Sequence, residues 1–390
     1  MLSSAQRTKA LGSLIFARVI YAVNWVNVGA IFYLMGSDLG VGISGLGTVT
    51  ATFYLGLGVM QLPGGLLAAK WGPKRVVVIG IFLSSLSVLG TSVSTSLAEV
   101  AVLRFLVGWG MAFVFAPAVI MVSGLLRGGK SGMGVGLLNS AFDVGGMLGI
   151  FGWVVIATVT GWRPSLMLSG GMGVLTGLLV AVFTPSDRDG ALPRVDRSSL
   201  RTVIFDKQLV LLGLGTMGFG IIYTEVSGFM TLYGVNFLGA SGIVSSLVAS
   251  LLTVVPIFTA LWGGRAFDFA SRHRTIMVLS MLGSAGALAL TAYPSLAAAA
   301  VSSALGGIII GVGYTFAFAG ARELNRAGKE YESLAVAWVN SISLTGSVFP
   351  SIFFSYVAES FGYGDAWLWS GLLTLAFVVP FVLMVEKWRR

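Results

Sequence analysis

The sequence has no cysteine, a single histidine and few charged residues. Without cysteine there is no disulfide, no thiolate metal site and no covalently attached haem. The one histidine, His273, stands between Arg272 and Arg274, where we expect it to be solvated and not a catalytic base or metal ligand. A phosphate-binding loop of the form GxxxxGK[ST] is also missing. We therefore expect no enzyme, no metal and no cofactor.

Apolar residues dominate the composition. They make up 56% of the 390 residues, charged residues only 10%, and the mean hydropathy is +0.92. A water-soluble domain with a polar surface does not have this composition. Crossing a bilayer takes roughly 20 apolar residues. Twelve such runs predict an all-α membrane protein, at about residues 11–34, 44–68, 75–96, 97–126, 132–157, 164–184, 209–233, 241–264, 275–293, 295–321, 331–358 and 364–387.

Positive charges predict the orientation of these spans. With both termini in the cytoplasm, all but three of the 24 Lys and Arg residues fall in cytoplasmic segments, as the positive-inside rule requires. The exceptions are Arg163 on the outer side, and Arg18 and Arg104 within spans. We predict a multi-pass protein of the cell membrane that keeps its first helix uncleaved. The net charge of +9 then reflects topology and contact with anionic lipids, not nucleic-acid binding.

Internal similarity divides the chain in two. The polar segment 186–208 separates six spans from six, which predicts a linker between bundles at 1–185 and 209–390. Residues 64–75 have a counterpart at 263–274, and Gly161–Ser165 have one at Gly362–Ala366. Repeats of this kind place a binding site near the midplane, between the halves. The pairs Gly145-Gly146 and Gly306-Gly307 favour helices that approach one another closely.

Four ionisable residues lie deep within the predicted spans, away from the span ends: Arg18, Arg104, Asp143 and Glu225. Such a residue in hydrocarbon costs several kcal/mol and normally faces the protein interior or a water-filled cavity. Together they indicate a polar pathway, and hence transport. Asp143 must be protonated or paired, because a lone buried anion is too unstable. Arg104 and Arg18 are its available partners.

Two motifs resemble the major facilitator superfamily, and the resemblance covers essentially the whole chain. The loop after the second span is similar to the signature G-x-L-a-D-r-x-G-r-k, with Ala69 at the acidic position. The fourth span is similar to R-x-x-q-G-x-g-x-a from Arg104 to Ala112. The resemblance implies two pseudo-symmetric six-helix bundles that work by alternating access as a monomer. The loop matches are Gly65, Leu67, Ala68, Lys70, Gly72 and Lys74, and in the second half Gly264, Asp268, Arg272 and Arg274.

The resemblance also implies roles for these residues. The loops form a conformational lock made by Gly65, Gly72 and Lys74 with Asp268 and Arg272, unless their charges only anchor the protein to the membrane. Arg104 belongs to a proton-coupling network or to an ion pair that orients helices. Organic-anion members of the family place an arginine in the first helix to bind substrate, as Arg18 would here.

Helical spacing groups further candidates around that arginine. Tyr21 and Trp25 share one face with Arg18, and Asn24 is adjacent. A guanidinium beside an aromatic hydroxyl suits a carboxylate or phosphate. The alternative is that Arg18 extends to the lipid interface. Asn139 shares a face with Asp143. In the second half, we expect Glu225 to carry a proton and the aromatic residues Tyr223, Tyr314 and Trp338 to complete the site, unless they only pack.

These observations favour a secondary transporter of a small organic anion, coupled to protons. The alternative is a proton antiporter that exports hydrophobic or cationic compounds and attracts them with Asp143 or Glu225. Drug antiporters of the family carry Gly-Pro before the Gly-Gly pair of the fifth helix, where this chain has Ala141-Phe142. That departure favours the first hypothesis.

Overall fold

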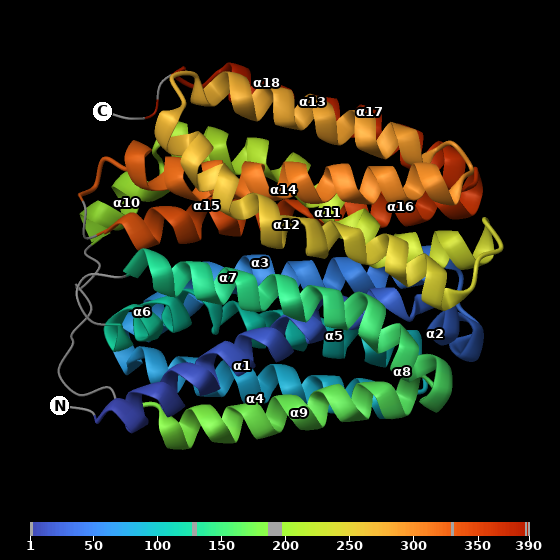
Figure 1. Ribbon diagram of the computed structural model, residues 1–390, viewed down its shortest axis with the longest axis horizontal. Helices are drawn as coiled ribbons and strands as arrows, with labels where there is room; N and C mark the ends of the chain where they lie inside the picture. Colours follow the sequence, from blue (N-terminus) through green and yellow to red (C-terminus); the bar gives the residue numbers. More distant parts are fainter. Residues whose placement is uncertain (1–2, 127–130, 186–196, 329–330, 387, 389–390) are drawn as a thin grey trace.

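The computed structural model describes residues 3–126, 131–185, 197–328, 331–386 and 388, and these residues form helices joined by short connections (Figure 1). Along the chain the helices are α1 (Ser4–Ala30), α2 (Phe32–Leu39), α3 (Ile43–Trp71), α4 (Pro73–Val93), α5 (Leu97–Ala112), α6 (Phe115–Leu125), α7 (Ser131–Met147), the π-helical turn η1 (Leu148–Gly152), α8 (Trp153–Thr160), α9 (Trp162–Phe183), α10 (Arg197–Ile204), α11 (Lys207–Asn236), α12 (Gly242–Phe269), α13 (His273–Thr291), α14 (Leu296–Leu324), α15 (Glu332–Gly346), α16 (Val348–Ser360), α17 (Tyr363–Ala376) and α18 (Val378–Val382).

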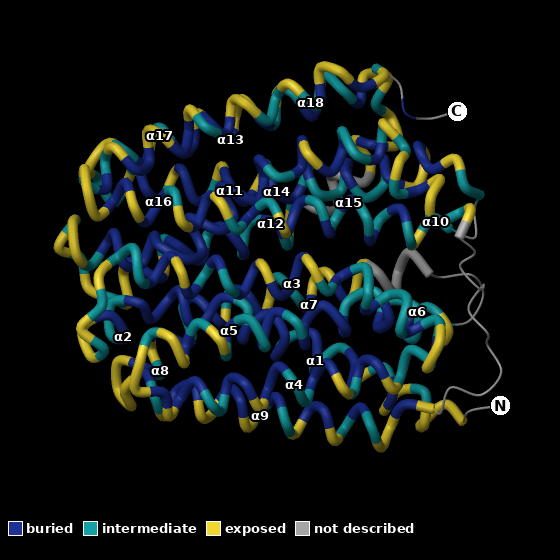
Figure 2. The backbone as a smooth tube through the Cα atoms, turned by 180° about the vertical axis from the view of Figure 1, so that it is seen from behind, coloured by how far each residue is buried: buried dark blue, intermediate teal, exposed yellow. Residues whose placement is uncertain are grey.

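In the described part of the chain, twelve helical stretches are long and apolar enough to cross a bilayer, which confirms the predicted spans. Four of them combine shorter elements: α5 with α6, α7 with η1 and α8, α15 with α16, and α17 with α18. Burial sorts the helices into central and peripheral ones (Figure 2). α1 and α11 are mostly buried, whereas exposed residues follow the outer sides of α9, α13 and α17. Many of the exposed residues are large and apolar, as expected for helices in contact with lipid.

The chain folds into two groups of helices that lie side by side in Figure 1, α1–α9 in blue to green and α10–α18 in yellow-green to red. We call them the first and the second half. Both termini lie at the same end of the molecule, which we call the termini end. Of the predicted linker 186–208, residues 186–196 lie outside the described residues. The rest contains α10 and the first turn of α11, where the Asp206 side chain accepts hydrogen bonds from the backbone N–H groups of Gln208 and Leu209.

The turns of the two halves repeat each other in conformation. Gly161 begins α9 with φ 86° and ψ 162°, and its counterpart Gly362 begins α17 with φ 99° and ψ 164°. Positive φ is open to glycine at little strain, which explains why both repeats place glycine there. The predicted close approaches at glycine pairs are also present. A Cβ on Gly146 would lie 2.9 Å from Thr253 Cγ2, and one on Gly307 3.0 Å from the Leu251 carbonyl oxygen.

The halves contact each other at the end remote from the termini. There α1 crosses α11 so closely that a Cβ on Gly29 would lie 2.8 Å from Gly228 Cα. Nearby, the Glu359 carboxylate at the end of α16 accepts a hydrogen bond from the Ser44 N–H in the first turn of α3, where the helix dipole favours an anion. Farther along α3, the Ser341 hydroxyl donates to the Gly58 carbonyl at 2.8 Å. The contacts at Gly29 and Glu359 close the remote end, whereas Ser341 meets Gly58 near the middle of α3.

Substituting Gly29 with valine should open this end. The added side chain meets α11 backbone, which cannot move aside as a flexible side chain can, so the halves must separate there. The chain has no cysteine, so Ser227→Cys, beside the crossing, gives a single thiol for maleimide labelling. We expect labelling several times faster in the Gly29→Val background. Gly171→Val adds the same side chain in open space and is the matched control. Equal labelling rates in the Gly29→Val and Gly171→Val backgrounds would show that the contact between α1 and α11 does not close this end.

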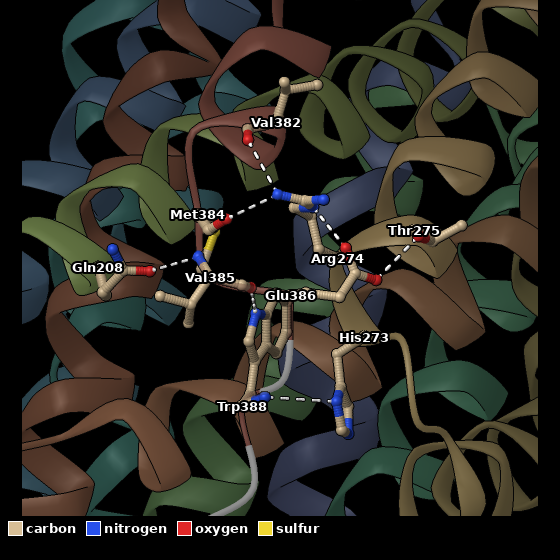
Figure 3. Close-up of polar contacts among 9 residues, drawn as sticks. All are labelled: Gln208, His273, Arg274, Thr275, Val382, Met384, Val385, Glu386 and Trp388. Atoms are coloured by element: carbon tan, nitrogen blue, oxygen red, sulfur yellow. Dashed lines mark hydrogen bonds and ion pairs between the residues drawn. The ribbon is translucent and has the colours of Figure 1, made fainter.

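The C-terminal segment after α18 folds back onto the termini end of the second half (Figure 3). Arg274 Nε lies 2.6 Å from Glu386 Oε2, and the Thr275 hydroxyl donates to the same carboxylate at 2.9 Å. The Thr275 hydroxyl, aided by the Arg274 guanidinium, holds the pKa of Glu386 below its usual range. A carboxyl group with a lowered pKa in the folded state stabilises at neutral pH and loses that contribution as the pH falls. The attachment should therefore weaken in acid.

His273 lies beneath this segment and is fully buried, so its predicted solvation is wrong. Its ring stacks on Trp388 at a centroid distance of 5.6 Å and lies 4.7 Å from the ring of Phe267. Its Nδ1 accepts a hydrogen bond from the Trp388 backbone N–H at 3.4 Å. The sequence places His273 between two arginines, but the returning C-terminal segment, distant in sequence, removes it from water.

Trp388→Ala should destabilise the protein by about 3 kcal/mol, as for other buried tryptophans. The Trp388 ring is 1% exposed and fills a space that a Cβ on Gly320 would enter, 2.5 Å from Trp388 Cε3. The readout is the melting temperature of the detergent-solubilised protein. Trp369→Ala removes a tryptophan that is 52% exposed and serves as the control. Equal melting temperatures for the two variants would contradict a stabilising role for the segment.

Candidate functional site

A cavity of about 180 Å³ lies between the two halves. Helices α1, α3, α6 and α7 supply its wall on one side, and α11, α12, α14 and α15 supply the other. Seven of the residues predicted to bind substrate or protons line it: Arg18, Tyr21, Trp25, Asn139, Asp143, Tyr223 and Tyr314. Its position at the interface of the repeated halves is the one expected of a transport site.

Arg18 is the cation of this cavity. Its side chain is 7% exposed, and the guanidinium carbon lies 4.4 Å from the ring centre of Tyr21, 4.5 Å from Phe115 and 4.6 Å from Phe142. Its Nε and Nη1 atoms have no hydrogen-bond partner among the described residues. Arg18 therefore does not extend to the lipid interface. Contacts with ring faces hold the guanidinium in place, and two of its nitrogens are left without a protein partner among the described residues.

Asp143 is the anion of the same cavity. It lies on α7 one helical turn after Asn139, and both line the cavity. None of the ion pairs within the described part of the chain includes Asp143 or Arg18, so their side chains share the cavity without direct pairing. The cavity wall thus holds one carboxyl group and one guanidinium at separate positions.

Arg104 makes a different contact from the one predicted. Its guanidinium donates to the backbone carbonyls of Asn24 at 3.0 Å and Trp25 at 3.2 Å, and lies over the Phe53 ring at 4.3 Å. The expected pairing with Asp143 is therefore wrong in this conformation. The reason is the position of α5, which packs against α3 and directs the arginine to the end of α1. Arg104 fixes the α1 backbone at Trp25, a residue that lines the cavity.

Glu225 is fully buried and does not line the cavity. Its Oε1 accepts a hydrogen bond from Ser370 of α17 at 2.8 Å, and its Oε2 has no partner among the described residues. Its predicted role as proton carrier stays a prediction. The carboxyl group lies inside the second half, separated from Arg18 and Asp143.

Two other predicted residues lie outside the cavity wall. Asn24 is buried on the opposite side of α1, where its side-chain oxygen accepts from Asn27 at 3.3 Å. Asn27 also donates to Ser169, so these residues join α1 to α9. Trp338 packs with the apolar residues at the termini end of the second half. Their predicted contact with substrate stays a prediction.

The model of the Major Facilitator Superfamily matches residues 14–325. The chain belongs to the major facilitator superfamily. A crystal structure of a bacterial homologue of the human lysosomal transporter Spinster, inward-facing and occupied, superimposes with a TM-score of 0.77 at 14% identity, covering 98% of this chain and 97% of that one. This likeness confirms the fold.

Two curated relatives are similar over part of their length. A probable sulfoacetate transporter of Cupriavidus necator is 27% identical over 183 residues, which are 47% of this chain and 43% of that protein. A 4-hydroxybenzoate transporter of Pseudomonas aeruginosa is 29% identical over 156 residues, which are 40% of this chain and 35% of that protein. The matches thus span less than half of either relative. By its superfamily and its fold, the protein is a multi-pass membrane transporter.

The residues of the loop signature lie where α3 meets α4 and where α12 meets α13. Gly72 joins α3 to α4 with φ 92°, a conformation that favours glycine. Lys74 donates to the Thr184 carbonyl at 2.7 Å, within the first half. Gly65 has open space around it, and Asp268 is exposed near the end of α12, just before Arg272 caps α13. Their role as a conformational lock stays a prediction.

Several cavity residues were missed from the sequence. Phe142 and Phe115 hold the Arg18 guanidinium, and Tyr54 accepts a hydrogen bond from Trp25 Nε1 at 3.2 Å. The sequence did point to Phe142, because it stands where drug antiporters of the family carry the proline of their Gly-Pro pair. Other missed polar residues are Gln61, Thr224, Thr253, Thr315, Asn340 and Ser347. Within the described residues, no group of His, Cys, Asp and Glu could hold a metal ion.

Proposed function

We propose that this superfamily member moves a small organic anion across the cell membrane together with a proton, by alternating access. The observation that carries the proposal is Arg18, a buried guanidinium that lines the cavity between the halves with N–H donors that have no protein partner. A buried cation without a paired carboxylate binds an anion well, because the ligand supplies the missing charge-assisted hydrogen bonds.

Asp143 supplies the site for the proton. When both side chains are ionised, Arg18 and Asp143 give the cavity no net charge, and an arriving anion would add an unbalanced negative charge. Protonation of Asp143 removes this repulsion, so anion and proton bind more tightly together than separately. Such coupling is reciprocal: the anion favours protonation as much as the proton favours the anion. Glu225 stays a second candidate for the proton carrier, but it lies away from the cavity.

The named substrates of the relatives are consistent with the proposal. Sulfoacetate and 4-hydroxybenzoate are both small organic acids. We further propose that the protein works as a monomer with both termini in the cytoplasm, in contact with anionic lipids. The remote end of the molecule would then face outward, and the closed contacts at Gly29 and Glu359 would separate the cavity from the outside.

A second candidate function is export of hydrophobic or cationic compounds in exchange for protons. Asp143 and the aromatic rings of the cavity support it, since a carboxylate and ring faces both attract cations. Arg18 opposes it, because a cation would have to bind beside a buried positive charge.

The proposal can be tested by measuring thermal stabilisation of the purified protein with a panel of ligands. A ligand that binds the folded state raises the apparent stability by RT ln(1+[L]/Kd). We expect sulfoacetate, 4-hydroxybenzoate or other small organic acids to raise the melting temperature, more at lower pH, and lipophilic cations such as tetraphenylphosphonium to have no effect. Stabilisation by the cations alone would favour the export function.

A further inference from the structure

Aromatic rings surround the cavity on the sides that both halves contribute. Tyr21 and Trp25 of α1 and Phe142 of α7 come from the first half, and Tyr223 of α11 and Tyr314 of α14 come from the second. Nine other polar or charged side chains also line the cavity, but most of its surface is apolar. Such a surface favours burial of a planar ring.

Three of these rings form a partial box. Phe142 and Tyr223 are inclined by only 29° to each other, with centroids 6.5 Å apart, although they belong to different halves. Trp25 stands at 86° to Phe142 and at 88° to Tyr223, with centroids 5.5 and 6.3 Å away. The set thus offers both ring faces and a ring edge. Aromatic pairs favour offset-stacked and edge-to-face arrangements, so a planar ring gains contacts here that a saturated ring does not.

The size of the cavity limits what the box can hold. Its free volume is about 180 Å³. An engineered protein cavity of about 150 Å³ binds benzene. The cavity therefore has room for one six-membered ring with a small substituent.

The polar atoms beside these three rings indicate which substituent the ligand's ring carries. Phe142 contacts the Arg18 guanidinium as well as the Trp25 and Tyr223 rings, so a ring in the box lies within reach of the cation. The hydroxyl of Tyr223 is buried and has no partner among the described residues, so it offers one further hydrogen bond. A carboxylate on the ring would take the Arg18 donors.

We propose that the substrate is a single-ring aromatic carboxylate of the size of benzoate. This inference rests on the proposed function and narrows it, since it assigns the ring to Trp25, Phe142 and Tyr223 and the carboxylate to Arg18. A ring packed against both Phe142 and Tyr223 contacts both halves, because these residues belong to α7 and α11. Binding therefore favours the conformation in which these helices are close, which is the differential affinity that a transport cycle needs.

The test compares three ligands on the full-length protein in detergent by isothermal titration calorimetry. Benzoate has the ring and the charge, cyclohexanecarboxylate has the charge without the aromatic ring, and benzamide has the planar ring without the charge. We expect benzoate to bind about tenfold more tightly than cyclohexanecarboxylate, and benzamide to bind far more weakly than either. In Phe142→Leu the ratio between the two acids should fall to near one, whereas Phe349→Leu, a substitution at an exposed position, should preserve it.

The outcomes separate this inference from the proposed function. Equal affinities for benzoate and cyclohexanecarboxylate would overturn the aromatic specificity and leave anion transport standing. Benzamide binding as tightly as benzoate would instead overturn the anion site at Arg18. Binding of none of the three would overturn both. Because the ligand comparison uses the unmodified protein, it decides the question even if Phe142→Leu does not fold.

Discussion

Asp143→Asn is expected to abolish accumulation of substrate driven by a pH gradient, while exchange of labelled substrate between equal pools continues. Asparagine keeps the size and a hydrogen-bonding amide, but it cannot bind and release a proton. If Asp143 must be neutral for the anion to bind beside it, the variant is fixed in a state equivalent to the protonated one. Substrate can then still cross with the conformational change, without the energy of the gradient. The measurement is uptake into proteoliposomes.

Glu225→Gln is the matched control, because it makes the same chemical change at a second carboxyl group deep within a span. Glu225 is sealed inside the second half and bonded to Ser370, so we expect accumulation to persist in this variant. The reverse pattern, loss in Glu225→Gln and persistence in Asp143→Asn, would move the proton site to Glu225. If both variants respond to a pH gradient as the unmodified protein does, the coupling ion is not a proton carried at either site.

Arg18→Ala is expected to weaken substrate binding by on the order of 100-fold or more, the typical effect of removing one partner from a buried charge pair. Arg18→Lys should recover only part of the affinity. A lysine restores the positive charge but not the planar fork that binds two carboxylate oxygens at once, and it stacks less well on the rings of Phe115 and Phe142. Binding can be measured by titration, and protein amount by its yield after purification.

Arg201→Ala provides the control for this series. Arg201 lies exposed on α10, outside the cavity, so its loss removes the same side chain without touching the site. It should bind substrate like the unmodified protein. An Arg18→Ala protein that binds equally well would show that the anion site lies elsewhere.

The fold could be predicted from the sequence because the bilayer constrains it strongly. Each span must be long, apolar and helical, and positive charges mark one side of the membrane. The repeated turns at Gly161 and Gly362 were visible as sequence and have matching conformations. The local sequence pattern was sufficient to predict the structure wherever a residue's position depends on contact with lipid or on its own helix.

The site could be predicted only in part, because it depends on how helices distant in sequence are placed. Spacing along α1 correctly grouped Arg18 with Tyr21 and Trp25, since one helix face is readable from the sequence. The same spacing could not identify the partner of Arg104, which depends on where α5 meets α1. Nor could it anticipate that Trp388 covers His273, a contact between residues that lie 115 positions apart.

The most direct test of the account is the proton uptake that accompanies binding. Substrate is added to the purified protein in a weakly buffered solution, and the change in pH is recorded with a dye. If an anion at Arg18 binds together with a proton at Asp143, the solution becomes more alkaline by up to one proton for each anion bound, and Asp143→Asn binds substrate without this change. Binding of the anion without proton uptake in the unmodified protein, or equal uptake in Asp143→Asn, would contradict it.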